Sequence, residues 1–383
     1  MRDLDRRTFL RLGVRGAALA GLVGAWPAHA WAIEGAPDWD AIVGKAVGFL
    51  KARQGDDGSW SGDRNEPGIT ALVVAGLLRS GKVTPAEPTI TKALAKLEQL
   101  VSPKGGLADS PHATYTTSVA LMAFHEANKD GRLDGVIKGC QDFLKGTQYD
   151  ETEGKGPNDL SYGGLGYGGG NSRPDLSNTS FFVDALRESG LPADDPALQK
   201  ALVFVSRCQN LKSEFNDQPH AAEINDGGFF YTSGPAPAGG GPGGKAAAKK
   251  ADTSTRSNAG MTYAGLKSMI YAGLTQDDVR VKAALGYIAK NYSLDENPGQ
   301  GQRGLYYYYM TFGKAMAALG KPTFVDEGGK AHDWRAELIA ALASRQDKNG
   351  GWANPVDRFL EGDPNIVTSY ALIALAAARA PVK

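Results

Sequence analysis

KAVGFLKARQGDDGSW, residues 45–60, is the stretch of sequence that decides the fold. Its landmarks are Lys45-Ala46, Phe49-Leu50, Gln54, Gly58 and Trp60. The last of five further partial copies keeps Gln346, Gly350 and Trp352 at the same spacing. The other copies begin near Lys92, Phe143, Lys200 and Tyr287. Recurrence at roughly 45–75 residues is typical of repeat architectures, and here it predicts six units.

Each landmark is followed by a second helical pattern. The first helix of the first unit, residues 41–53, is amphipathic, whereas the second reads ITALVVAGLL and is apolar nearly all round. A helix that is apolar on every side must be buried on every side, and stacked neighbours must bury it. We therefore predict an all-α (α/α)6 toroid with two concentric rings of helices. The buried helices are expected at residues 69–78, 116–127, 179–188, 258–272, 306–319 and 365–378.

The turn between the two helices has its own chemistry. Gly58 and Gly228 are expected to take positive φ where the first helix ends. The repeated glutamines are expected to bridge backbone groups at neighbouring helix ends. The chain has two cysteines, Cys140 and Cys208. Their positions in the repeat differ by seven residues, about 10 Å along a helix. That offset exceeds what a disulfide allows, so both are predicted to be free.

The N-terminus and two loops fall outside the repeat. Arg6 and Arg7 open the run RRTFLR, which is typical of a twin-arginine export signal, so residues 1–30 are predicted to be a signal peptide and the mature protein periplasmic or otherwise exported. The toroid is expected at residues 38–380. Residues 234–257 are expected to form a flexible Gly/Pro/Ala-rich loop, and residues 149–174 a long decorated loop.

Composition excludes several classes of partner. Lys and Arg number 42, as do Asp and Glu, so the chain carries no basic excess for nucleic acid. The apolar part of the leader is too short for a mature transmembrane helix, and none is expected. The scattered histidines, His112, His125, His220 and His332, lack metal-ligand spacing, so neither a metal nor another cofactor is predicted.

Lys45–Trp60 resembles the Gln–Trp repeat of squalene and oxidosqualene cyclases, found in looser form in protein prenyltransferase β subunits. The resemblance covers about residues 38–378. It implies an (α/α)6 toroid with a central cavity that, in those families, binds an isoprenoid. The catalytic motifs of those families do not carry over, because the chain lacks the Asp-x-Asp-Asp acid and the prenyltransferase zinc ligands.

Candidate site residues lie where the buried helices begin. Asp175 either caps the third buried helix or, in an apolar pocket with a raised pKa, donates a proton. Aromatic residues at comparable points predict an aromatic lining for the cavity. They are Tyr115, Phe181, Tyr263, Tyr306, Tyr307, Tyr308, Tyr309 and Tyr370. Packing between helices is the alternative role for the tyrosines.

Three functions remain open from the sequence. The first is binding of an isoprenoid-like apolar ligand in the cavity, with or without cyclase, isomerase or transferase chemistry. The second is a non-catalytic binding or interaction scaffold. The third is a carbohydrate-active (α/α)6 hydrolase or lyase, for which Asp175 with Asp226 or Glu223 is the only carboxylate pair available. The sequence leaves the oligomeric state open.

Overall fold

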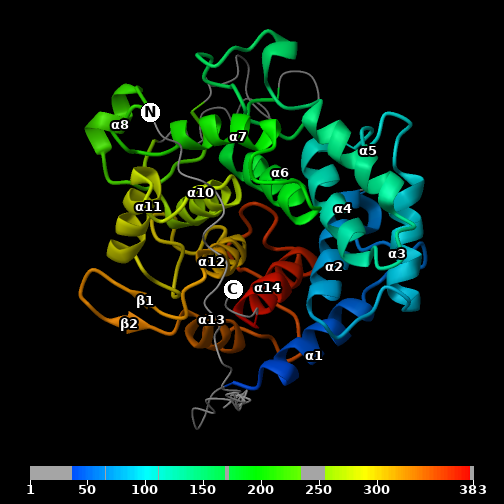
Figure 1. Ribbon diagram of the computed structural model, residues 1–383. Coiled ribbons are helices and arrows are strands. Elements are labelled where there is room, and N and C mark those ends of the chain that lie inside the picture. The colour runs from blue at the N-terminus through cyan, green and yellow to red at the C-terminus, as the bar shows by residue number, and fades with distance from the viewer. Residues whose placement is uncertain (1–36, 65, 111, 169–171, 234–254, 380–383) are drawn as a thin grey trace, which may run out of the picture. The chain divides into compact units, whose positions relative to one another are not determined.

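The computed structural model describes residues 37–64, 66–110, 112–168, 172–233 and 255–379 (Figure 1). The predicted signal peptide and residues 234–254 of the predicted flexible loop lie outside the described residues, so both stay predictions. From Pro37 onward the chain forms one unit. Within its described part, every helix is too short or too polar to cross a bilayer.

Helices of the described residues alternate between an outer and an inner ring (Figure 1). The outer helices are α1 (Trp39–Lys51), α3 (Pro88–Gln99), α5 (Asp134–Lys145), α7 (Pro196–Arg207), α11 (Val279–Lys290) and α13 (Trp334–Ala343). The inner helices are α2 (Pro67–Arg79), α4 (Ala113–Ala127), α6 (Leu176–Glu188), α10 (Ala259–Tyr271), α12 (Leu305–Leu319) and α14 (Pro364–Arg379). A short helix α8 (Pro219–Ile224) and a hairpin of β1 (Phe324–Val325) and β2 (Ala331–His332) decorate the outside. The predicted all-α toroid is confirmed.

The inner ring is closed. Each inner helix packs against the next in chain order, and α14 packs against α2. The predicted inner helices agree with the observed bounds to within three residues. This closure follows from the sequence, because helices that are apolar all round need neighbours on both sides.

In four of the six units, a repeated glutamine ties the unit to the next one. Its side-chain amide donates to the carbonyl of the turn glycine in its own unit and to a carbonyl in the first turn of the following outer helix. The donors are Gln54, Gln148, Gln209 and Gln346. In the last unit the acceptor is Ile42 of the first outer helix, 2.9 Å from the Gln346 amide nitrogen. The expected bridging role is confirmed, and the bond to Ile42 joins the last unit to the first.

Glycines in the turns allow each turn to approach the next outer helix closely. Gly350 has φ +92°, and a Cβ there would lie 2.6 Å from the Lys45 carbonyl oxygen of the next outer helix. Gly163 has φ +80°, and a Cβ there would lie 1.8 Å from the Lys200 carbonyl oxygen. In the fourth unit the residue with positive φ is Gly227, so the prediction for Gly228 was wrong by one position.

Both cysteines are free and buried, as predicted. Cys140 lies in α5, and Cys208 follows α7. Burial raises the pKa of each thiol to about 12, so both remain protonated at neutral pH.

Candidate functional site

The middle of the inner ring is filled by side chains. In the described residues, the middle turns of the six inner helices are buried throughout, including Met122, Ser180, Thr311 and Ile373. Residues that keep accessible surface are found at the two ends of these helices. The open central cavity that the resemblance implied is therefore absent from these turns, and a ligand site has to be sought at an end of the ring.

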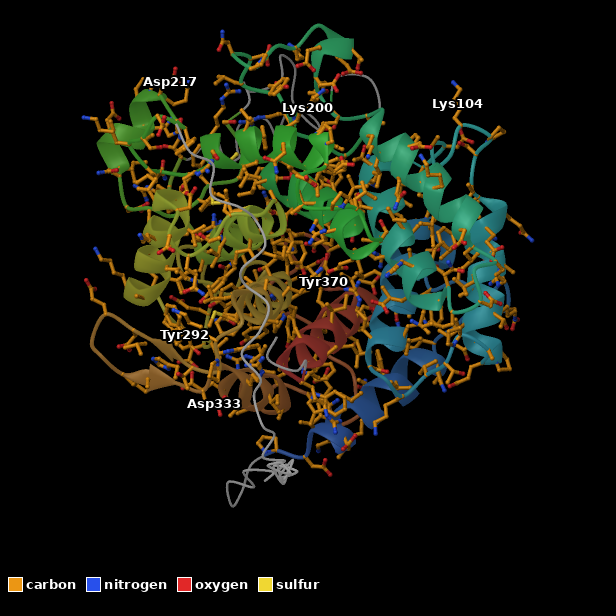
Figure 2. All side chains as sticks on the ribbon, in the orientation of Figure 1. Lys104, Lys200, Asp217, Tyr292, Asp333 and Tyr370 are labelled. Carbon is orange, nitrogen blue, oxygen red and sulfur yellow. The ribbon has the colours of Figure 1, made fainter. Side chains whose placement is uncertain are left out.

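Six aromatic side chains gather at the N-terminal ends of the inner helices, and we call this cluster the aromatic mouth. Its members are Tyr115, Tyr167, Phe181, Tyr231, Tyr307 and Tyr370. The Tyr115 and Phe181 ring centroids lie 5.1 Å apart, and those of Tyr307 and Tyr370 lie 6.0 Å apart. Figure 2 shows Tyr370 toward the middle of the ring, whereas Lys104 and Asp217 lie at the periphery.

The aromatic mouth combines desolvation with partial exposure. Burial is the largest cause of the raised pKa values of Tyr115, Tyr167, Tyr231 and Tyr307, and it raises that of Tyr115 to about 12. Each of these four side chains nevertheless keeps some accessible surface. The four tyrosines are thus desolvated and still partly accessible, so the mouth offers an aromatic surface at this end of the ring.

Asp175 lies beside the mouth as the N-cap of α6. Its Oδ1 accepts from the Asn178 backbone N–H at 2.8 Å, and its Oδ2 accepts from the Asn178 side-chain amide at 2.7 Å. Burial raises the pKa of Asp175 to about 6, although these bonds and one with the Tyr231 hydroxyl favour the ionised form. Capping, one of the two expected roles, is thus observed, and the carboxyl also has a pKa suited to proton transfer near neutral pH.

Glu361 is a second buried carboxyl at this end of the ring, and it was not among the residues predicted from the sequence. Its Oε1 accepts from the backbone N–H groups of Tyr306 and Tyr307, and its Oε2 accepts from the Asn354 amide. Gly304, the N-cap residue of α12, has no side chain to fill this role. Burial raises the pKa of Glu361 to about 7. The loop before α14 thus caps α12 directly under a residue of the mouth.

The predicted aromatic residues divide into two groups. Tyr115, Phe181, Tyr307 and Tyr370 meet in the mouth. The hydroxyls of Tyr308 and Tyr309 donate to carbonyls of Ser293 and Leu294 after α11, so these two side chains point outward. Tyr263 packs on Tyr308 and Phe312, and Tyr306 packs on Tyr309. These four tyrosines pack between helices, which is the alternative role that the sequence left open for them.

Three members of the site come from segments outside the predicted inner helices. Tyr167 lies in the loop before α6, Ser177 in the first turn of α6, and Tyr231 in the segment that follows the fourth turn. The hydroxyl of Ser177 lies near that of Tyr307, and the hydroxyls of Tyr167 and Tyr231 lie near each other, so that each affects the pKa of its neighbour. The Gly- and Tyr-rich composition of the loop at residues 149–174 was the feature of the sequence that could have indicated Tyr167 as a site residue.

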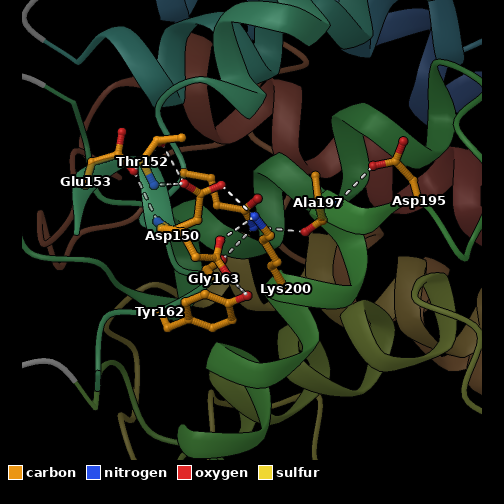
Figure 3. A network of polar contacts seen from close by, with 10 residues as sticks. Asp150, Thr152, Glu153, Tyr162, Gly163, Asp195, Ala197 and Lys200 are labelled. Carbon is orange, nitrogen blue, oxygen red and sulfur yellow. Dashed lines mark hydrogen bonds and ion pairs between the residues drawn. The ribbon is translucent and has the colours of Figure 1, made fainter. Parts of the chain in front are cut away.

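Ion pairs hold that loop in place (Figure 3). The Lys200 ammonium on α7 lies 2.8 Å from Asp150 Oδ2 and 2.8 Å from Glu151 Oε2. The Tyr162 hydroxyl donates to the other Glu151 oxygen. Hydrogen bonds to Lys200 and Thr152 lower the pKa of Asp150 to about 2 in spite of its partial burial. These contacts hold the start of the loop in which Tyr167 lies.

A second cluster, which we call the charge layer, spans the C-terminal half of the ring. Its members are Arg79 of α2, Glu126 of α4, Asp184 and Glu188 of α6, Lys267 of α10 and Lys314 of α12. Glu188 pairs with Arg79 at 2.5 Å and with Lys314 at 2.8 Å. Neither α2 nor α12 is a ring neighbour of α6, so these contacts cross the axis of the ring.

The charge layer is balanced, with three cations and three carboxylates. Asp184 is fully buried and contacts both Lys267 and Lys314. Burial lowers the pKa of Lys267 to about 8, against the attraction of Asp184. The positive charges of Arg79 and Lys314 hold the pKa of Glu188 well below its usual range. These residues neutralise one another, and they place charged rather than apolar side chains in the C-terminal half of the ring.

Other ionisable residues lie away from the mouth. No group of three metal-ligating side chains is found in the residues that the structure describes. His332 instead lies between two carboxylates, 3.1 Å from Asp326 and 2.9 Å from Glu337. Asp226 and Glu223, the expected carboxylate partners of Asp175 in a carbohydrate-active enzyme, are exposed, whereas Asp175 is buried. Asp226 folds back on its own turn, accepting from the Gly228 N–H.

Comparison with known proteins gives the fold. No family model and no curated protein matches the sequence. Among solved structures, the apo type II terpene cyclase MstE from Scytonema is similar, with 13% identity, coverage of 88% of this chain and 97% of that one, and a TM-score of 0.52. A variant of that cyclase bound to geranylgeranyl dihydroxybenzoate, its substrate, matches with 13% identity, coverage of 89% and 97%, and a TM-score of 0.51.

A variant of a glycosidase is similar to the same extent, with 12% identity, coverage of 89% of this chain and 96% of that one, and a TM-score of 0.51. The neighbours thus include a terpene cyclase and a glycosidase. They share the helical toroid with this chain, and at this identity they show the fold alone.

Proposed function

We propose that the protein binds an isoprenoid or another apolar ligand at the aromatic mouth, with Asp175 as the candidate proton donor. The observation that carries the proposal is the mouth itself, in which six aromatic side chains lie beside a buried carboxyl whose pKa is raised to about 6. Aromatic faces bind apolar chains and stabilise a developing positive charge. A carboxyl with this pKa is partly protonated near neutral pH and can act as a general acid.

The filled middle of the ring limits the ligand. Side chains occupy the inner turns, and the charge layer lies below them. A ligand therefore lies among the tyrosines of the mouth, or enters further only by moving Phe181 and Tyr370. This favours a short or partly inserted apolar group over a long chain enclosed by the ring.

A non-catalytic scaffold is the second candidate. It is favoured by the side chains that fill the middle of the ring. It is also favoured by the hydrogen bonds to both oxygens of Asp175, which a helix cap explains without any catalytic role. The two candidates differ in whether a ligand binds at the mouth and whether Asp175 acts on it.

Ligand extraction followed by mass spectrometry tests the proposal. We expect protein purified from its native membrane-containing lysate to carry an isoprenoid-like compound. A Tyr307→Ala variant is expected to lose it, and a Tyr308→Ala variant, whose side chain points outward, to keep it. Equal retention, or no ligand in the wild-type protein at all, would favour the scaffold.

Incubation of the protein with the extracted compound tests the acid. Asp175→Asn keeps an acceptor for the Asn178 N–H but removes the ionisable proton, so we expect ligand binding without conversion. Asp226→Asn is the matched control, because Asp226 also accepts a backbone bond but lies outside the mouth. Conversion that survives in Asp175→Asn removes Asp175 from the chemistry.

Export is part of the proposal. The pair Arg6–Arg7 supports transport through the twin-arginine pathway, which places the mouth outside the cytoplasm. Cell fractionation checks this point. Arg6→Lys together with Arg7→Lys is expected to retain the protein in the cytoplasm, and unchanged export would contradict it.

A further inference from the structure

The loop before α14 exposes a group of apolar side chains, which we call the apolar tip. It consists of Val356, Phe359 and Leu360, which are 40%, 60% and 49% exposed. These are three of the six large apolar side chains that are exposed among the described residues. Residues 355–360 are all exposed, so the tip lies on the surface.

The backbone of the tip is strained. Phe359 and Leu360 both have φ +62°. The left-handed region is unfavourable for bulky side chains, and the third described non-glycine residue there, Asn225, is of a type that tolerates it. Two successive strained residues persist only where surrounding contacts hold them, and such strain clusters at functional sites.

Buried contacts on both sides hold the tip. The Asn354 N–H donates to the Glu361 carbonyl, which closes the loop at its base. The Glu361 carboxyl is fixed to the start of α12, and Asp363 pairs with Arg64 at 3.1 Å. The anchored base thus keeps Phe359 and Leu360 exposed, although their backbone conformation is unfavourable.

Three arginines lie in or beside the tip, and Asp357 and Asp363 offset part of their positive charge. Arg358 lies within it, with its guanidinium 5.2 Å from the centre of the Phe359 ring. Arg64 pairs with Asp363 of the same loop, and Arg303 precedes Gly304, whose Cβ position faces the Phe359 ring. All three arginines are exposed. Asp357 within the tip accepts from the Gly362 N–H and is engaged in holding the loop.

We infer that the apolar tip inserts into a lipid surface that carries anionic headgroups. Apolar side chains on an exposed loop lose water when they enter the acyl boundary, and neighbouring arginines favour anionic headgroups. A stable protein interface needs about 800 Å² per partner, far more than three side chains supply. Size and charge together therefore favour a membrane over a second protein.

The tip and the aromatic mouth lie at the same end of the ring, because Glu361 of the loop binds the backbone of Tyr307. Insertion would turn the mouth toward the lipid. The inference does not depend on the proposed ligand, because adsorption to a membrane is measured without one.

Vesicle sedimentation and a site-specific probe test the inference on the full chain. The double variant Phe359→Asn with Leu360→Asn removes the apolar surface with a residue that tolerates positive φ, so the fold is retained. We expect at least about tenfold weaker association with phosphatidylglycerol vesicles than for the wild type. Val325→Thr is the matched control, because Val325 is 54% exposed but lies on β1, and its association is expected to be unchanged.

A fluorophore on a Leu360→Cys variant reports the position of the tip. Cys140 and Cys208 are buried, so the introduced thiol alone is labelled. We expect a blue shift with phosphatidylglycerol vesicles, a smaller one with phosphatidylcholine, and none for Val325→Cys. Equal spectra at the two positions would overturn the inference. So would a tip-dependent dimer without vesicle binding, which would assign the tip to a second copy of the chain.

Discussion

The Asp184 carboxylate on α6 lies 2.7 Å from the Lys267 ammonium on α10, and neither side chain is more than 1% exposed. Lys314 reaches the same carboxylate from α12. Removing one member of a buried ion pair leaves an uncompensated charge away from water, which costs far more than the intact pair contributes. The charge layer is therefore the part of the ring most sensitive to a single substitution.

Asp184→Asn is expected to lower the free energy of unfolding by about 3–5 kcal/mol, because it leaves two buried lysines with one fewer negative partner. Urea denaturation measures the change. Asp142→Asn serves as the control, since Asp142 pairs with Lys138 on the surface, where such pairs contribute at most about 1 kcal/mol. Equal effects of the two substitutions would mean that the charge layer is not buried in solution.

Glu361 predicts a pH dependence of stability. Its pKa is raised to about 7, so between about pH 4.5 and 7 the folded protein holds a proton that the unfolded chain releases. This contribution to stability is complete below pH 4.5, declines as the pH rises from 4.5 to 7 and is lost above 7, about 3 kcal/mol in all.

Denaturation at a series of pH values checks this sign. We expect Glu361→Gln to remove most of the decline between pH 4.5 and 7, because the amide keeps an acceptor for Tyr306 and Tyr307 without ionising. Asp175, whose pKa is raised to about 6, contributes a smaller decline of the same sign that this variant retains. An unaltered profile in Glu361→Gln would contradict the burial of Glu361.

We expect the two bonds of Gln346, one of which closes the ring, to contribute as much to the free energy of unfolding as the equivalent bonds of a glutamine inside the ring. Gln346→Ala leaves the carbonyls of Ile42 and Gly350 without this donor, at a cost of about 1–3 kcal/mol. Gln148→Ala removes the equivalent two bonds inside the ring and is expected to cost the same. A near-zero effect at Gln346 alone, measured by urea denaturation, would show an open ring.

The thiols predict a simple kinetic result. Cys140 and Cys208 are buried, and burial raises the pKa of each to about 12. In native buffer, we expect a thiol reagent to react only as fast as the protein opens. In denaturant, we expect both thiols of each chain to react immediately. Fast reaction of either cysteine in the folded protein would contradict its position.

The repeat was predictable because its determinants are local. Gln54, Gly58 and Trp60 lie within one turn, and the same contacts recur wherever the spacing recurs. Tyrosine directions were less predictable, because four consecutive tyrosines cover the whole circumference of α12. Neighbouring segments decide which ring faces the mouth, and the carbonyls of Ser293 and Leu294 turn Tyr308 and Tyr309 outward.

The charge layer was not predictable from local pattern. Lys267 and Lys314 are single charges in otherwise apolar helices, and their partner Asp184 is 83 and 130 residues away in the chain. The available signal was an isolated charge within a helix expected to be buried on all sides, since such a charge needs a partner. Nothing in the sequence pattern indicated that Glu361 is buried at the site, because its loop does not recur in the other units.

Closure by Gln346 and Ile42 has a topological consequence. The Arg379 guanidinium at the end of α14 also lies 3.2 Å from the Asp40 carboxylate at the start of α1. Because the two ends of the ring meet, the order of the units is cyclic, and the backbone break between the last and the first unit is one of several places where the chain could be open. Circular permutants that join residue 379 to residue 37 through a short linker and open the chain between two other units should assemble the same ring.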